Sequence, residues 1–177
     1  MLAFRCTTKS PADEAWSGEL NQTECAGHLG CLAGRHVAHS LGSLAGKCDP
    51  LVSATLSPAG ACERLRHGGE LHILEADSCV DMSTEERARA SLAHAYCLDW
   101  YEYETAVWQA PKHAEVLLLR GSYQSRVLAR VARAEIPPPF LERSERWGCL
   151  DWAEQEALES ELLAWARSLV ERRTQPE

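Results

Sequence analysis

The residues best suited to chemistry gather between positions 25 and 48. Cys25, His28 and Cys31 follow one another at intervals of three, and further histidines and a cysteine come after them. Thiolate and neutral imidazole are the usual zinc ligands, and a structural zinc site needs four of them around the ion. A continuous helix could not bring four of these residues together, and the chain has no Cys-x-x-Cys pair. We therefore expect no cofactor, with zinc at Cys25, His28 and Cys31 as the alternative.

A second group lies between residues 94 and 102. His94 and Cys97 are three residues apart, as are Asp99 and Glu102, so each pair would lie one turn apart on a helix. Imidazole and thiol can act as base and nucleophile, and two carboxylates can exchange protons with a substrate. Such carboxylates are common on exposed helices, so we expect a solvated face here.

Arginines form a third candidate site. Arg126, Arg130 and Arg133 have the spacing of one face of a helix. The guanidinium group binds two oxygens of a carboxylate or phosphate at once, which suits an acidic partner. Ion pairs with glutamates of the last helix are the alternative use of these side chains.

The last helix carries a fourth candidate, an apolar seam. Asp151 and Glu154 form a capping signature, and a helix is predicted beyond it. Its apolar residues alternate in steps of four and three, as in a short coiled coil, and are Leu158, Leu162, Trp165 and Leu169. The seam predicts either an interface or a core face.

Charge and composition exclude several classes of protein. The 177 residues carry a net charge of −8, which argues against binding to nucleic acid or to anionic membranes. No uninterrupted apolar stretch is long enough to span a bilayer. The first residues show no secretory signal, so the eight cysteines are expected to be reduced in a cytoplasmic protein. Motifs of the common nucleotide-binding and hydrolase folds are missing.

The second half of the chain must position most of these residues, and its pattern is mainly helical. A capping box at residues 83–86 begins a predicted helix that extends toward Pro111, with Tyr96, Trp100 and Tyr103 on its core face. Residues 114–119 fit a strand or a helical turn. Another helix is predicted from Ser122 to Glu135, followed by an extended spacer at residues 137–139.

The first half is less regular. Small residues recur every fourth position from residue 26 to residue 46, which favours close helix packing. Residues 51–56 and 70–76 indicate one short strand pair at most. We therefore predict a mainly α protein, a compact helical domain with at most a short two-stranded β element in the first half. Residues 1–76 would form an irregular part rich in Gly and Cys, and 77–177 a helical part of the same domain.

These patterns favour a non-enzymatic, helical, protein-binding adaptor, assembly factor or regulatory factor. Its partner would be another protein, including a second copy of the same chain, and would dock on the arginines or on the seam. Aromatic residues and arginine supply most of the binding energy at interfaces, and the chain has six tryptophans. The alternative function is a metal-dependent or thiol-dependent enzyme that uses Cys and His residues of the first half, or His94 with Cys97.

Overall fold

The computed structural model describes residues 1–12, 29–39, 51–77 and 79–174. Among these residues, six strands form one antiparallel sheet. The strands are β1 (Leu2–Thr7), β2 (Leu51–Thr55), β3 (Glu70–Glu75), β4 (Val80–Asp81), β5 (Glu115–Leu119) and β6 (Val127–Ala132). The helices are α3 (Leu29–His39), α4 (Pro58–Arg64), α5 (Glu85–Ser91), α6 (Trp100–Lys112), α7 (Tyr123–Arg126), α8 (Pro138–Glu145) and α9 (Trp152–Thr174).

The sheet shows that the prediction of a mainly α protein is wrong. Its strand order is β4-β5-β2-β1-β3-β6, and its strands come from residues 2–132 rather than from a short part of the first half. The segments predicted as one strand pair, β2 and β3, are both strands but do not pair with each other, because β1 lies between them. Strands β1, β2 and β3 come from residues 1–76, and β4, β5 and β6 come from residues 77–177.

The single helix predicted from Ser122 to Glu135 is wrong, because strand β6 occupies the middle of this segment. Only the four residues of α7 are helical before β6 begins at Val127. Along β6, Ala129 and Val131 point into the core, two residues apart, as a strand requires. Val127 and Val131 also fit a helical spacing, so the pattern in so short a segment did not distinguish the two structures.

The predicted helix of residues 83–111 is two helices. Thr84, rather than Ser83, caps α5, which ends at Ser91, and a reciprocal capping box between Asp99 and Glu102 begins α6. The intervening residues 92–99 form turns. The proline segment also differs from the prediction: Pro138 begins α8 instead of extending a spacer, because proline is well suited to the first turn of a helix.

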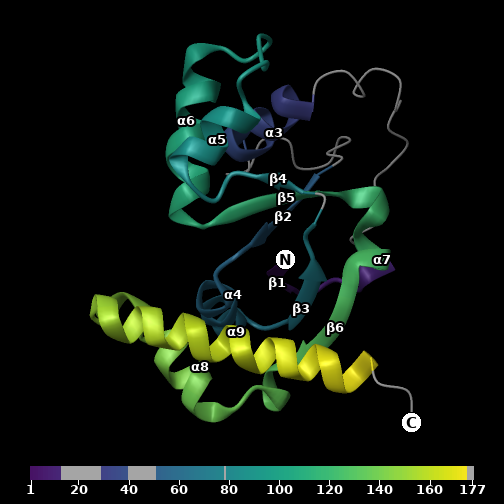
Figure 1. The fold of residues 1–177 in the computed structure, drawn as a ribbon, viewed down its shortest axis with the longest axis vertical. Helices are drawn as coiled ribbons and strands as arrows, with labels where there is room; N and C mark the ends of the chain where they lie inside the picture. Colours follow the sequence, from purple (N-terminus) through teal and green to yellow (C-terminus); the bar gives the residue numbers. More distant parts are fainter. Residues whose placement is uncertain (13–28, 40–50, 78, 175–177) are drawn as a thin grey trace.

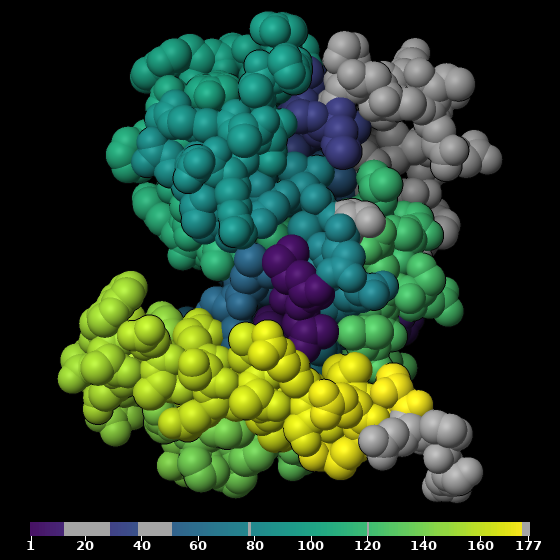
Figure 2. Space-filling model, in the orientation of Figure 1, coloured from purple at the N-terminus to yellow at the C-terminus, as the bar shows by residue number. Residues whose placement is uncertain are grey.

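Helices cover one face of the sheet in two separate groups. Phe4 and Ile73 pack under α4, α8 and α9. Farther along the same face, Leu51 and Leu117 pack under α3, α5 and α6. Figure 1 shows the two groups at opposite ends of the molecule, and Figure 2 shows a hollow between them on the side where α9 begins. The opposite face of the sheet packs against Tyr123.

Within the described ranges, no helix combines the length and the apolar character needed to cross a membrane.

Candidate functional site

The structure places one residue of the predicted zinc site and gives it another role. Cys25 and His28 lie outside the described residues, whereas Cys31 lies in α3 and forms a disulfide with Cys97. The Cα atoms of the two cysteines are 6.0 Å apart, within the usual range for a disulfide. Cys97 and His94 lie in the turns between α5 and α6 rather than on a helix. Over the part of the chain that the structure describes, no three His, Cys, Asp or Glu residues converge as metal ligands.

The three arginines do not share one helix face. Arg126 ends α7 and donates to the Ser122 hydroxyl oxygen at 3.0 Å. Arg130 lies in β6, where its two donors reach the Glu70 carboxylate at 2.8 and 3.0 Å. Arg133 follows that strand and forms an ion pair with Glu145. Each guanidinium group therefore has a partner within the chain, and those partners are not glutamates of α9.

The apolar seam of α9 packs within the chain. Leu158 and Leu162 are fully buried against the sheet, and Trp165 and Leu169 pack at the edge of the same core. The ring of Trp165 meets Phe140 of α8 edge to face, with the centroids 6.2 Å apart. The capping signature that predicted this helix is confirmed, because Asp151 and Glu154 each accept a hydrogen bond from the other's backbone N–H.

A network of hydrogen bonds around the buried His72, which we call the relay, lies on one face of the sheet near β6. Strand β3 places Glu70 and His72 on one face, and the register that pairs His72 with Arg130 brings the arginine to that face. The Nε2 atom of His72 is 2.7 Å from Glu70, and Nδ1 is 2.8 Å from the Tyr123 hydroxyl. Hydrogen bonds from Arg130 are the main reason that the pKa of Glu70 is lowered. Because an ionised Glu70 only accepts, Nε2 of His72 must donate, and a neutral His72 accepts from Tyr123 at Nδ1.

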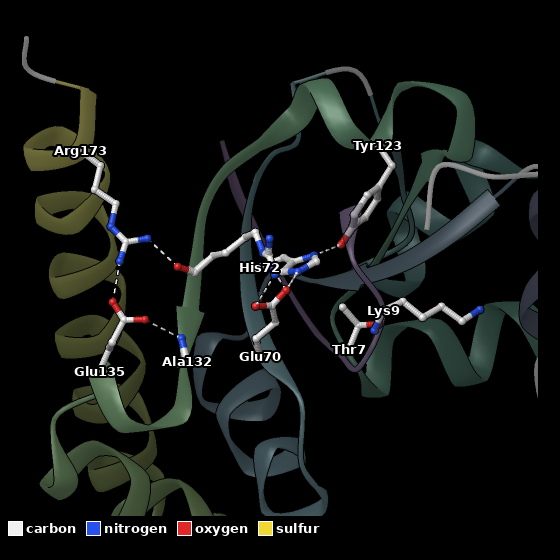
Figure 3. Close-up of polar contacts among 9 residues, drawn as sticks. Thr7, Lys9, Glu70, His72, Tyr123, Ala132, Glu135 and Arg173 are labelled. Carbon is white, nitrogen blue, oxygen red and sulfur yellow. Dashed lines mark hydrogen bonds and ion pairs between the residues drawn. The ribbon is translucent and has the colours of Figure 1, made fainter. Parts of the chain in front are cut away.

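The relay continues to the end of α9, as Figure 3 shows. Arg173 donates to the carbonyl oxygen of Arg130 and, at 2.7 Å, to Glu135. The second oxygen of Glu135 accepts from the backbone N–H of Ala132 at 2.7 Å. These contacts connect the end of α9 to β6, which is an edge strand of the sheet, and to the residues that follow it. His72 and Tyr123 are fully buried, so a substrate cannot reach them, and we assign the relay to positioning rather than to chemistry.

A serine, a histidine and a glutamate meet under α3. The Ser53 hydroxyl of β2 donates to Glu115 of β5 at 2.5 Å and lies 2.7 Å from Nε2 of His36. In a catalytic triad the imidazole takes the serine proton and the carboxylate orients the imidazole. Here the carboxylate takes the serine hydrogen bond, so His36 must donate to the serine oxygen. The three side chains satisfy one another's hydrogen bonds at the face of the sheet. The histidine does not lie between the serine and the carboxylate, as it does in a nucleophilic triad.

Exposed aromatic side chains lie on α6 and in the turn before it. Tyr96 is 87% exposed, Trp100 78% and Trp108 57%, and Tyr101 is also exposed. On a helix, positions 100, 101, 104 and 108 fall within about 100° of arc, so the residues of α6 share one face. Glu104 lies on this face and accepts a hydrogen bond from the Trp108 indole at 3.3 Å. We call Tyr96, Trp100, Tyr101 and Trp108 the α6 aromatic surface.

Tyr96 and Trp100 are predicted from the sequence to lie in the core, and the structure places both on the surface. The prediction assumed one continuous helix, in which residues 88, 92, 96 and 100 share a face. The break at residues 92–99 leaves Ala88 and Leu92 buried and turns Tyr96 and Trp100 outward. Aromatic residues near Asp99, Glu102 and Glu104 were the signal in the sequence that could have indicated an exposed surface.

The chain matches no family model, no curated protein and no solved structure in the three comparisons made. The fold class of the described residues is α and β mixed, an antiparallel sheet with two groups of helices on one face.

Proposed function

We propose that this protein is a non-enzymatic protein-binding adaptor, assembly factor or regulatory factor, and that the α6 aromatic surface binds its partner. The observation that carries the proposal is the exposure of Tyr96, Trp100, Tyr101 and Trp108. Single exposed apolar residues are ordinary on a protein surface. Several large aromatic residues on one short segment are not, because leaving them in water forgoes the free energy of burying them.

Trp and Tyr are the residues that most often anchor interfaces. Their rings are large and rigid, so they bury much apolar area for little loss of side-chain entropy. The arginines and the seam of α9, which the sequence also suggested as docking residues, already have partners inside the chain. The α6 aromatic surface therefore replaces them in the proposal.

Charge indicates what kind of partner fits. Residues 76–110 contain seven carboxylates and two arginines. Both arginines already form ion pairs, Arg87 with Asp81 and Arg89 with Glu85. Glu104 lies between Trp100 and Trp108 on the helix face, and a guanidinium or ammonium group could stack on an indole ring while pairing with this carboxylate. The proposed occupant is a segment of another protein that is rich in arginine and lysine.

A second copy of the chain is a poorer occupant of the same surface. A twofold contact would bring two identical acidic surfaces together, and like charges across an interface are unfavourable.

The test measures binding of a labelled peptide of alternating arginine and serine to the full chain. We expect Trp108→Ala to weaken binding by about tenfold, as the loss of an interface anchor does. The control is Trp152→Ala, because Trp152 is also exposed, at 79%, but lies at the start of α9. Glu104→Gln should weaken binding and reduce its dependence on salt.

Three results would overturn the proposal. Equal losses in Trp108→Ala and Trp152→Ala would mean that the peptide does not bind specifically at the α6 aromatic surface, and no loss in either variant would mean that it binds the net negative charge instead. A dimer in sedimentation that Trp108→Ala dissociates, without peptide binding to the wild type, would assign the surface to a second copy.

A further inference from the structure

We infer that the Cys31–Cys97 disulfide is a reversible redox site, that a dithiol reductant attacks it at Cys97, and that its reduction weakens the α6 aromatic surface. The last part of this inference rests on the proposed function, whereas the site of attack does not.

The two cysteines differ in exposure. Cys31 lies in α3, is 4% exposed and belongs to the same core cluster as Val37, Leu92 and Ala95. Cys97 lies in an exposed turn. Thiol–disulfide exchange requires a thiolate to reach one of the two sulfurs directly. Cys97 meets that requirement, and Cys31 is the sulfur that leaves.

The exchange needs two electrons and two protons, which a dithiol supplies. One thiolate of the reductant forms a bond to the Sγ atom of Cys97. The bond between Cys97 and Cys31 breaks, and its electron pair stays on the Cys31 sulfur, which takes up a proton. The second thiolate of the reductant then displaces Cys97, which also ends as a thiol. The reductant leaves as a disulfide, and the reverse sequence with an oxidised dithiol restores the bond.

Most of the other described cysteines are poor competitors for this chemistry. Burial raises the pKa of Cys6 and of Cys79. Burial, with a smaller contribution from Glu159, raises the pKa of Cys62 to about 12. Such thiols stay protonated near neutral pH and react slowly, because the thiolate is the reactive form. Cys149 is exposed, and it provides an internal reference for the reactivity of an ordinary surface thiol.

The disulfide holds the segment from which the α6 aromatic surface begins. Cys97 follows Tyr96 and precedes Trp100 by three residues. Besides the disulfide, residues 95–98 are held to α3 by packing on two glycines and by a hydrogen bond from Arg35 to the Cys97 carbonyl oxygen at 3.1 Å. Arg35 also lies 3.6 Å from Glu102 at the start of α6.

After reduction, residues 95–98 depend on noncovalent contacts such as these, and the Arg35 side chain, which contacts both Cys97 and Glu102, is about half exposed. A segment that moves more freely must be ordered when a partner binds, and that ordering reduces affinity. The oxidised protein is therefore the form that binds, and the reduced protein binds more weakly.

The site of attack is tested with two full-length variants, Cys31→Ser and Cys97→Ser, exposed to oxidised glutathione and mapped by mass spectrometry. We expect Cys31→Ser to acquire glutathione at Cys97, and Cys97→Ser to leave Cys31 unmodified, with equal modification of Cys149 in both. Circular dichroism confirms that both variants are folded.

The wild-type chain gives the same test without substitution. Brief treatment with reduced glutathione followed by acid quenching should trap the mixed disulfide on Cys97, with Cys31 as the thiol. Modification of Cys31 at the rate of Cys97 would overturn the inference. Two alkylatable thiols at these positions in protein purified without reductant would overturn it as well.

Coupling to binding is tested by titrating the arginine–serine peptide into oxidised and dithiothreitol-reduced protein. We expect reduction to weaken binding about threefold or more in the wild type, and not to change it in the Cys31→Ser/Cys97→Ser double variant. Equal affinity of the two wild-type forms would overturn the coupling. A peptide that fails to bind the oxidised protein would count against the proposed function, while the glutathione experiment would still decide the redox site.

Discussion

Gly30 of α3 lies directly beneath the carbonyl oxygen of Ser91, the last residue of α5. A Cβ atom at position 30 would be 2.9 Å from that oxygen, too close for an unaltered backbone. One turn later, Gly34 faces the side chain of Leu98 in the same way. The two glycines let α3 approach the connection between α5 and α6, which confirms, for these two positions, the close packing predicted from the spacing of small residues.

The first prediction is that Gly30→Ala destabilises the protein by about 1–3 kcal/mol, the usual cost of overpacking. Alanine favours a helix more than glycine does, but the backbone of Ser91 would have to move to accommodate it. Urea unfolding measures the change. The control is Gly148→Ala, because a Cβ atom there would meet no atom within 4 Å. A Gly30→Ala variant at least as stable as the wild type would mean that α3 does not lie against Ser91.

The second prediction concerns Tyr123, whose hydroxyl is the hydrogen-bond partner of the buried His72. Tyr123→Phe leaves Nδ1 of His72 without that partner, and an unsatisfied buried polar group costs about 1–3 kcal/mol. Urea unfolding again measures the loss. Tyr101→Phe provides the control because Tyr101 is exposed, and it should leave stability unchanged. Equal stability of the Tyr123→Phe and Tyr101→Phe variants would contradict the relay.

The sequence predicted those elements whose signals are local. The reciprocal cap of Asp151 and Glu154 needs only four neighbouring residues, and it located α9 correctly. The β-branched and alternating residues of β2 and β3 likewise indicated strands.

The sheet could not be predicted because its pairings join distant residues. Strand β3 pairs with β1 on one side, at separations of 63 to 73 residues, and with β6 on the other, at separations of 53 to 62 residues. No local pattern distinguishes a six-residue strand such as β6 from a short helix, since Val127 and Val131 fit both. Only the partner strand decides the structure of such a segment.

The polar clusters were missed for the same reason. His72 meets Tyr123 across 51 residues, and Ser53 meets Glu115 across 62. The predicted sites consist of residues close together in the chain, such as Cys25 and Cys31. The fold instead joins Cys31 to Cys97, 66 residues away.

The third prediction concerns pH and Glu159 of α9. Burial raises the pKa of this carboxyl above its ordinary value of 4.5, although Ser57 and the backbone N–H of Ala59 donate hydrogen bonds to it. The folded state thus holds the proton more tightly than the unfolded state does. The contribution of Glu159 to stability is therefore fully present below pH 4.5 and is lost as pH rises through the raised pKa.

Glu159→Gln should remove the loss of stability that ionisation of Glu159 causes as pH rises. The difference in unfolding free energy between the wild type and this variant should therefore change between pH 4.5 and neutrality. Urea unfolding at several pH values measures it. Glu156→Gln is the control, because Glu156 is an exposed residue of the same helix. A difference that stays constant with pH would mean that Glu159 titrates as it does in the unfolded chain.

The fourth prediction separates the core of the protein from its binding surface. Leu162 is fully buried in α9, so Leu162→Ala should cost about 2–5 kcal/mol of unfolding free energy, the usual price of a core cavity. Trp108 is more than half exposed, so Trp108→Ala should change stability by less than about 0.5 kcal/mol. Under conditions where both variants are folded, Leu162→Ala should bind the arginine–serine peptide normally and Trp108→Ala should not. The reverse pattern would place the partner on α9, because a leucine that sealed an interface would affect binding more than folding.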